Sequence, residues 1–171
     1  MAIRTVLTYP DPFLREKAGP VTEFGPALDA LITDMAETMW DEPGIGLAAT
    51  QVGVPLQLFV YDLEVSRDPA RVQVICNPVF KVMEGEETDE EGCLSVPGFT
   101  SEVSRAARVV VEARDRNGDP ITLDVTGLHA RVLQHESDHL NGILFIDRIS
   151  PLKRGIFKRR HKKKALARSA L

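Results

Sequence analysis

"RVLQHESDHLNG", residues 131–142, contains the pattern His-Glu-x-x-His. Helix positions four apart share one face and stand roughly 5–6 Å apart at Cβ, so His135 and His139 can reach a single metal ion. Leu128 and Val132 precede them on the same stripe. We therefore expect a buried apolar face, on which unpaired imidazoles would be costly. A metal ion held by the two histidines is the simplest explanation of the pattern.

Three segments of the chain have the pattern of helices. Apolar residues recur at helical spacing over 26–40, where they form a stripe that a helix would bury. The histidine segment is predicted to be helical from residue 127 to 141, and Gly142 stands where a helix is expected to end. Ser150-Pro151 is typical of a helix start, with a capping serine and proline at the first helical position.

The remaining segments have the pattern of strands and loops. Residues 56–62 and 71–84 are predicted strands, the second interrupted at Asn77-Pro78, and two further strands flank the turn at 116–119. Glycines and prolines predict a structured loop over 41–55. Strands and helices do not alternate, which favours the α+β class. We expect antiparallel or mixed sheets packed around the metal-binding helix, with an N-terminal helix and a C-terminal basic helix.

A metal site with two histidines needs a third protein ligand, and the chain after them lacks the usual ones. A metzincin would have a histidine at the position of Phe145. A thermolysin-like peptidase would have a downstream glutamate, but no glutamate follows Glu136. Asp147 remains as the one possible oxygen ligand after the histidines. Upstream, Cys93 stands in "EEGCLSVPG" (90–98), where a glycine permits close backbone approach and a thiolate suits a divalent transition ion. This ligand set leaves one tetrahedral position open, as in catalytic sites.

Three short motifs resemble the signature motifs of peptide deformylase, in the order of that family. They are "GIGLAATQ" (44–51), "EGCLS" (91–95) and "QHESDHLNG" (134–142). The spacing between them and the size of the chain agree with bacterial-type members. The resemblance implies an enzyme that removes the formyl group from the N-terminal formyl-methionine of new polypeptides. The chain departs from the family at Arg105-Ala106, where an arginine–proline pair is commoner.

The resemblance implies one divalent metal ion, held by Cys93, His135 and His139. It points to Fe²⁺ as the working ion, with Zn²⁺, Ni²⁺ or Co²⁺ as replacements, although raw affinity favours Zn²⁺ over Fe²⁺. The implied reaction is attack of metal-bound water on the formyl carbonyl, with Glu136 as general base. Gln51 and the backbone N–H of Leu94 are the implied oxyanion hole.

The resemblance also implies the substrate contacts. The substrate backbone would lie beside Ile45, Gly46 and Gly92. The methionine side chain would enter a pocket bounded by Leu128, Val132 and His135. Glu91 is expected near the rim of this pocket. Arg131 is expected to line the pocket with its aliphatic stem while its charge reaches water.

The composition is that of one soluble globular domain. The chain has 171 residues, no apolar run long enough to span a membrane, and two cysteines, which favours a reducing cytoplasm over a disulfide scaffold. Cys76 is predicted to be an ordinary core residue. We expect residues 1–150 to form the catalytic part, with 151–171 as a basic helix that has no independent fold.

The net charge of −4 conceals an acidic body and a basic tail. Residues 151–171 hold nine Lys or Arg and no acid, which leaves a net charge of −13 on residues 1–150. Such a tail is either a solvated terminus or an electrostatic contact for RNA. The family resemblance favours ribosome binding through residues 152–171. Two other functions stay open: a zincin-type endopeptidase, and a non-catalytic RNA- or ribosome-binding protein with a structural metal.

Overall fold

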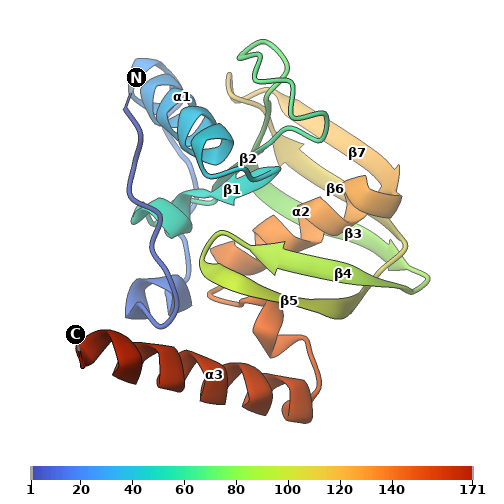
Figure 1. The fold of residues 1–171 in the computed structure, drawn as a ribbon. Helices are drawn as coiled ribbons and strands as arrows, with labels where there is room; N and C mark the ends of the chain where they lie inside the picture. Colours follow the sequence, from blue (N-terminus) through green and yellow to red (C-terminus); the bar gives the residue numbers. More distant parts are fainter. Residues whose placement is uncertain (1, 171) are drawn as a thin grey trace.

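The helix that carries both histidines, α2 (Gly127–Leu140), lies between two β-sheets (Figure 1). This arrangement comes from a computed structural model, which describes residues 2–170. One sheet has five strands in the order β1-β2-β3-β6-β7, and β4 and β5 form a separate hairpin. Their bounds are β1 (Gly46–Ala48), β2 (Leu58–Tyr61), β3 (Gln73–Glu84), β4 (Glu87–Cys93), β5 (Val96–Arg105), β6 (Arg108–Arg114) and β7 (Pro120–Thr126). All these strands pair antiparallel, which confirms the α+β prediction.

The five-stranded sheet is covered by a helix on each face. Leu58 and Val60 of β2 pack in the cluster that contains the apolar stripe of α1 (Pro26–Asp41). Their neighbours Phe59 and Tyr61 pack in the cluster that contains Val132 and other residues of α2. Successive strand residues point to opposite faces, so a strand buried on both faces is continuously apolar. The predicted helix over 26–40 and its buried stripe are confirmed.

The predicted interruption at Asn77-Pro78 is a bulge within β3 and does not end the strand. The register of β3 against β6 shifts between Cys76 and Val79. Asn77 has a positive φ of 53°, and its side chain accepts a hydrogen bond from the backbone N–H of Val21 and donates one to its carbonyl. The predicted loop over 41–55 also holds more order than expected, because it contains β1 and the 3₁₀ helix Ala49–Val52.

The β4–β5 hairpin was not predicted from the sequence. Residues 87–90 of β4, "ETDE", are all exposed and polar, so they lack the apolar alternation of a half-buried strand. Their order comes from pairing with β5, whose Val96 and Val103 are buried. Beneath the hairpin, these valines belong to a third apolar cluster with Phe145 and Phe157.

The end of α2 depends on a glycine. Gly142 has a φ of 71°, and a Cβ atom at this position would lie 2.3 Å from the carbonyl oxygen of Arg15. No other residue fits there without moving the backbone, so the predicted helix stop is confirmed. The expectation of an apolar stripe that is buried throughout is wrong at the start of the helix. Leu128 is 54% exposed, whereas Val132 is buried.

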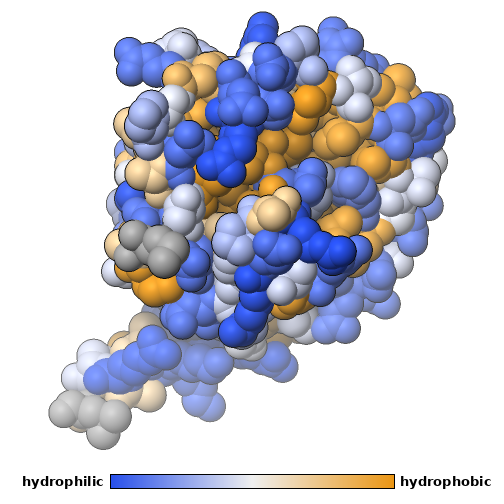
Figure 2. Space-filling model, turned by 90° about the horizontal axis from the view of Figure 1, so that it is seen from above, coloured by the Kyte–Doolittle hydropathy of each residue, from blue (hydrophilic) through white to orange (hydrophobic). Residues whose placement is uncertain are grey.

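The last helix, α3 (Pro151–Ser169), starts as predicted, with the Ser150 side chain accepting from the backbone N–H of Lys153. Phe157 is its one buried residue and ties the helix to the third apolar cluster. The C-terminal half of the helix projects from the body, and its surface is mostly hydrophilic (Figure 2). Within residues 2–170, none of the helices is long and apolar enough to cross a membrane.

Candidate metal centre and active site

Three potential metal ligands converge at the middle of α2. Ligand atoms of Cys93, His135 and His139 all lie within 4.8 Å of one another. The Cys93 Sγ atom is 3.3 Å from Nε2 of His139. The histidines come from one face of α2, and the cysteine is the last residue of β4, where the register of the hairpin shifts. The missed hairpin therefore supplies the third ligand.

The geometry of these groups fits a divalent ion. A tetrahedral ion with bonds of about 2.0–2.3 Å separates its nitrogen and sulfur ligands by roughly 3.3–3.7 Å. The distance between Cys93 and His139 falls in this range. Beside the ligands, Oε2 of Glu136 is buried and has no hydrogen-bond partner among residues 2–170. A polar atom in that position is normally satisfied by water or a ligand, as it would be in a hydrated metal site.

Glu91 fixes the orientation of His135. Its Oε1 atom lies 2.8 Å from Nδ1 of the imidazole, which leaves Nε2 available to bind an ion. The carboxylate also accepts two hydrogen bonds from Arg105 and one from Arg131. Burial raises the pKa of Glu91, but the hydrogen bonds and charges of Arg105 and His135 outweigh it and hold the pKa well below its usual range. The carboxylate is therefore ionised.

Arg105 extends the buried charge network from Glu91 toward the surface. Nη1 of Arg105 donates to Asp138 over 2.6 Å, and Asp138 also accepts two hydrogen bonds from Arg148. Arg105 is almost fully buried, whereas the Arg148 side chain is 44% exposed. Through these contacts the hairpin, α2 and the segment before α3 are held together around His135.

Glu136 lies against β1 at the ligand site. Burial raises the pKa of Glu136 to about 7, so both protonation states are accessible near neutral pH. A Cβ atom added to Gly46 would lie 2.5 Å from Oε1 of Glu136. A glycine is therefore needed at position 46 to leave room for this carboxylate.

Gln51 is held in a fixed orientation beside the thiol. Its Oε1 accepts from the backbone N–H of Ala48 over 2.9 Å, which assigns Nε2 to the opposite side. Nε2 donates to Ser95 over 3.0 Å and lies 3.6 Å from the Cys93 sulfur. The side chain is 1% exposed. The arrangement aims an amide donor at the place where the ligands converge.

These groups face one cavity of about 630 Å³, a normal size for a small-molecule or peptide site. The predicted site residues that line it are Ile45, Gly46, Gln51, Glu91, Gly92, Cys93, Leu94, Leu128, Arg131, Val132, His135 and Glu136. His139 does not line the cavity and is 1% exposed. The cavity thus combines an apolar wall with two of the three candidate metal ligands, a buried carboxylate and an oriented amide, which suits hydrolysis of an amide bond.

Comparisons with known proteins agree with this chemistry. A model of the polypeptide deformylase family matches residues 3–155. The chain is 52% identical over 164 residues to the peptide deformylase of Syntrophobacter fumaroxidans, covering 96% of each chain. The chain belongs to the peptide deformylase family. Two solved peptide deformylases share its fold: that of Legionella pneumophila, with 47% identity, 98% of each chain covered and a TM-score of 0.90, and that of Thermus thermophilus, with 43%, 96% and 0.88.

Membership of the peptide deformylase family makes the chain a hydrolase that removes N-formyl groups from peptides. It also implies a divalent metal ion, and Cys93, His135 and His139 form a ligand set for one. Asp147, the downstream candidate for the third ligand, instead pairs with Arg15 and accepts from the backbone of Leu144.

Two expectations about the deformylase pocket are wrong. Glu91 does not stand at an open rim, because it is 6% exposed and its oxygens are bound by Arg105, Arg131 and His135. The charge of Arg131 does not reach water. Its guanidinium pairs with Glu91 and donates to the carbonyl oxygens of Val103 and Glu87. Both residues brace the hairpin against α2 in addition to lining the cavity.

Sequence reasoning missed the groups that hold the site in place. Arg105 attracted notice only as a departure from the family pattern, and the pairing of Asp138 with two arginines was not foreseen. Asp138 lies inside the histidine motif and Ser95, which bonds Gln51, lies inside the cysteine motif. Asp138 is an acid next to His139 on a helix expected to be buried, and a buried carboxylate needs a cation. This requirement could have predicted that an arginine or lysine pairs with Asp138.

Proposed function

We propose that this family member removes the formyl group from the N-terminal formyl-methionine of newly made polypeptides, using the residues of the cavity around Cys93. The observation that carries the proposal is a Cys-His-His ligand set at the wall of one cavity, which Cys93 and His135 line together with Glu136 and Gln51. The reaction breaks the amide bond between the formyl carbon and the methionine nitrogen, and water supplies the hydroxyl group of formate and a proton for the amine.

Cys93, His135 and His139 are proposed to hold the ion, with Fe²⁺ as the working metal and Zn²⁺, Ni²⁺ or Co²⁺ as replacements. When bound, a divalent ion acts as a Lewis acid that makes water a competent nucleophile near neutral pH. The thiolate and the exposure of Cys93 to the cavity make oxidation a risk for the Fe²⁺ form.

Glu136 is proposed as the general base. Its partnerless Oε2 can accept the proton of the attacking water, and its raised pKa then allows delivery of that proton to the departing amine. Gly46 supports this role passively, because the missing side chain gives the carboxylate its place.

Gln51 and Leu94 are proposed to stabilise the oxyanion that develops on the formyl oxygen. Nε2 of Gln51 carries two hydrogens, one of which donates to Ser95 while the other faces the Cys93 sulfur at 3.6 Å. The second hydrogen is proposed to turn to the formyl oxygen when substrate binds. Leu94 follows the ligand Cys93 and can add its backbone N–H. Loss of one such donor typically lowers kcat on the order of 10²–10³.

The substrate is proposed to lie along the cavity wall formed by Ile45, Gly46 and Gly92, with backbone contacts of the kind made by an added strand. Its methionine side chain would contact Val132 and Leu128. The 54% exposure of Leu128 in the free enzyme fits a residue that becomes covered when substrate binds. The aliphatic stem of Arg131 completes the wall, while its charged end stays paired with Glu91.

The tail is proposed to bring the enzyme to the ribosome, in the cytoplasm where chains are made. Arg154 is already engaged, since it donates to backbone carbonyls including those of Ile146 and Asp147, and Lys153 lies 3.9 Å from Glu102. Seven basic residues remain for rRNA phosphates: Lys158, Arg159, Arg160, Lys162, Lys163, Lys164 and Arg168. Binding should therefore weaken steeply with salt.

The structure changes how the tail should be tested. Deleting residues 152–171 would remove the buried Phe157 and uncover the third apolar cluster. Changing Lys158, Arg159, Lys162 and Lys163 to glutamine keeps that anchor. The changed enzyme should hydrolyse short formyl-Met peptides normally and bind ribosomes less well in co-sedimentation. Equal binding of the two forms would show that the tail is only a solvated terminus.

The substrate class is tested with the full-length protein, purified and loaded with Fe²⁺ without oxygen. A formyl-Met peptide should release formate, while an acetyl-Met peptide of the same sequence should react far more slowly. Cleavage of internal bonds in unformylated peptides would favour the endopeptidase alternative. Metal binding without either activity would favour the structural-metal alternative.

A further inference from the structure

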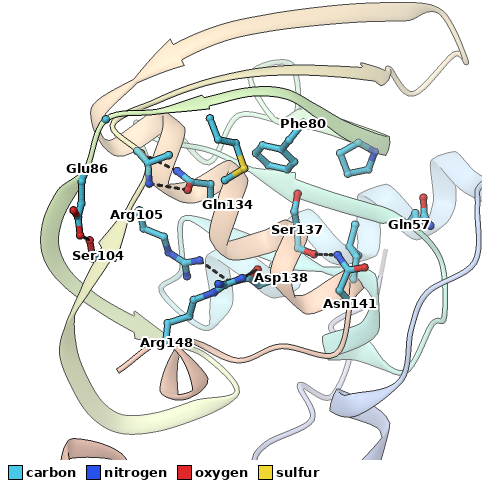
Figure 3. Close-up of a pocket in the computed structure, with 15 residues that line it drawn as sticks. Gln57, Phe80, Glu86, Ser104, Arg105, Gln134, Ser137, Asp138, Asn141 and Arg148 are labelled. Carbon is cyan, nitrogen blue, oxygen red and sulfur yellow. Dashed lines mark hydrogen bonds and ion pairs between the residues drawn. The ribbon is translucent and has the colours of Figure 1, made fainter. Parts of the chain in front are cut away.

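A second cavity, of about 530 Å³, is lined by residues of α2 other than the candidate metal ligands (Figure 3). α2 contributes Gln134, Ser137, Asp138 and Leu140, and Asn141, the residue that caps its C-terminal end, continues the same wall. The opposing walls come from β3, the turn after it, and the end of β5. The two cavities share no lining residue. Nothing in the deformylation mechanism uses this second space.

A buried hydroxyl group in the wall of this cavity has no hydrogen-bond partner within residues 2–170. Ser137 is 7% exposed, and its Oγ atom has no hydrogen bond to any residue between 2 and 170. Figure 3 shows the Oγ atom directed toward the ring of Phe80, while the Ser137 carbonyl accepts from Asn141. A buried hydroxyl left unpaired is costly, so a donor or acceptor from outside the chain is expected there.

The cavity also contains a cation with donor capacity to spare. Arg148 uses Nε and Nη2 for Asp138, and its Nη1 donates to no residue within the described chain. Counting the buried network behind it, Arg105, Arg131 and Arg148 face the carboxylates of Asp138 and Glu91. Three cations against two anions leave one excess positive charge, and Arg148 is its solvent-facing end.

The lining of the cavity also contains one acidic residue, Glu86, and an apolar surface. Glu86 brings a negative charge to the lining, but it is exposed and accepts a hydrogen bond from Ser104. Its charge is therefore screened by water. The rest of the lining offers apolar surface, with Phe80 half-buried and Met83 57% exposed. A ligand that suits this lining has an anionic group at one end and an apolar body.

We propose that this cavity binds a small amphipathic carboxylate. Its carboxylate would accept hydrogen bonds from Nη1 of Arg148 and from the Ser137 hydroxyl, a charge-assisted arrangement. Its apolar part would cover Phe80 and Met83 and remove their surface from water. The proposal concerns binding only and does not depend on the catalytic roles assigned above.

Methionine labelling offers a local probe of this site. The chain has four methionines, and of the described ones Met83 lines the cavity whereas Met35 and Met39 are fully buried in α1. Full-length, Zn²⁺-loaded protein carrying ¹³C-methyl methionine is titrated with sodium octanoate. The Met83 methyl resonance should shift and saturate, while those of Met35 and Met39 stay in place.

Variants assign the binding to the proposed groups. Ser137→Ala and Arg148→Gln should each weaken octanoate binding by about tenfold, the scale of one charge-assisted hydrogen bond. Arg116→Gln is the matched control. Arg116 pairs with one aspartate, Asp29, and its side chain is 42% exposed, close to Arg148, but it lies outside the cavity. This control should bind octanoate normally.

Several results would overturn the proposal. One is a Met83 resonance that does not saturate up to about 10 mM octanoate. Another is equal binding of 1-octanol, which would show that the carboxylate contributes nothing. A third is unchanged affinity in Arg148→Gln. Inhibition of formyl-peptide hydrolysis by octanoate with Met83 unmoved would place the ligand in the metal cavity instead, and would also count against the proposal.

Discussion

Oε1 of Glu91 lies 2.8 Å from Nδ1 of His135, and this contact joins strand β4 to the helix that carries the metal ligands. The carboxylate accepts the proton on Nδ1, so the imidazole presents Nε2 to the ion. Because Cys93 stands two residues after Glu91, the same strand supplies one ligand and orients another. The geometry of the metal site therefore depends on how the β4–β5 hairpin packs against α2.

Replacing Glu91 with glutamine should weaken metal binding by about 10–100-fold, because the amide supports His135 less strongly and leaves the buried Arg131 without a charge partner. Competition with a chelator measures this affinity at a temperature where the variant is folded. Glu87→Gln, an exposed change on the same strand, is the control and should bind metal normally. Unaltered affinity in Glu91→Gln would mean that the contact does not orient the ligand.

Loss of Arg105 should lower the free energy of unfolding more than loss of an exposed arginine that makes the same number of ion pairs. Arg105→Met leaves Glu91 and Asp138 without a shared cation in a buried setting, so unfolding should become easier by about 3–5 kcal/mol. Arg108→Met is matched, since Arg108 also pairs with two carboxylates but in exposed positions, and its effect should be much smaller. Urea unfolding compares them. Equal losses would contradict the buried network as the source of stability.

Gly46→Ala should displace the carboxylate of Glu136, the proposed general base, without deleting it. The added Cβ would lie 2.5 Å from Oε1 of Glu136, the movable end of a side chain, so the protein should fold and retain its metal. A carboxylate moved by about 1 Å should lower kcat on the order of 10². Gly19→Ala is the control, because its added atom would meet only ordinary contact at 3.8 Å. Wild-type turnover in Gly46→Ala would remove Glu136 from its proposed position.

The hydrogen bonds that the buried carboxylate of Asp62 accepts predict a specific acid sensitivity. Burial raises the pKa of Asp62, but hydrogen bonds from Ser66, Trp40 and Glu64 hold it below its ordinary value. A lowered pKa in the folded state stabilises the protein above the unfolded pKa of about 4, and this contribution is lost as the pH falls further. Trp40, the single tryptophan, donates to Asp62 and reports unfolding by fluorescence.

Between pH 6 and pH 3, the wild-type protein should lose more of its free energy of unfolding than Asp62→Asn does. Asparagine cannot titrate, so that part of the pH dependence disappears, whereas acid release of the metal is common to both proteins. Identical pH profiles for the two proteins would show that Asp62 is not stabilised as an ion.

The sequence predicted best where a residue's role depends on its own neighbours. The helix stop at Gly142, the serine cap of α3 and the ligand spacing of His135 and His139 are local features, and all are present in the structure. The β4–β5 hairpin was not predicted, because β4 is ordered by pairing with β5 and not by a pattern of its own. Its exposed acidic face carries no pattern of its own.

The burial of Glu91 and Arg131 was also not predicted from the sequence. Glu91 was expected near the rim of the pocket, and the charge of Arg131 was expected to reach water. They are buried because four charged groups from three elements, Glu91, Arg105, Arg131 and Asp138, neutralise one another in space. A single sequence does not show which distant residues meet, so the network that holds the metal site became visible only in three dimensions.

The most direct test of the account is the metal content and deformylase activity of Cys93→Ala beside Cys76→Ala. Both proteins are prepared without oxygen, loaded with Fe²⁺ and given a formyl-Met peptide. Cys76 is buried in the core away from the ligands, so its variant should hold one ion per chain and release formate. Cys93→Ala should lose both the ion and the activity. Stoichiometric metal and normal formate release in Cys93→Ala would contradict the metal centre described here.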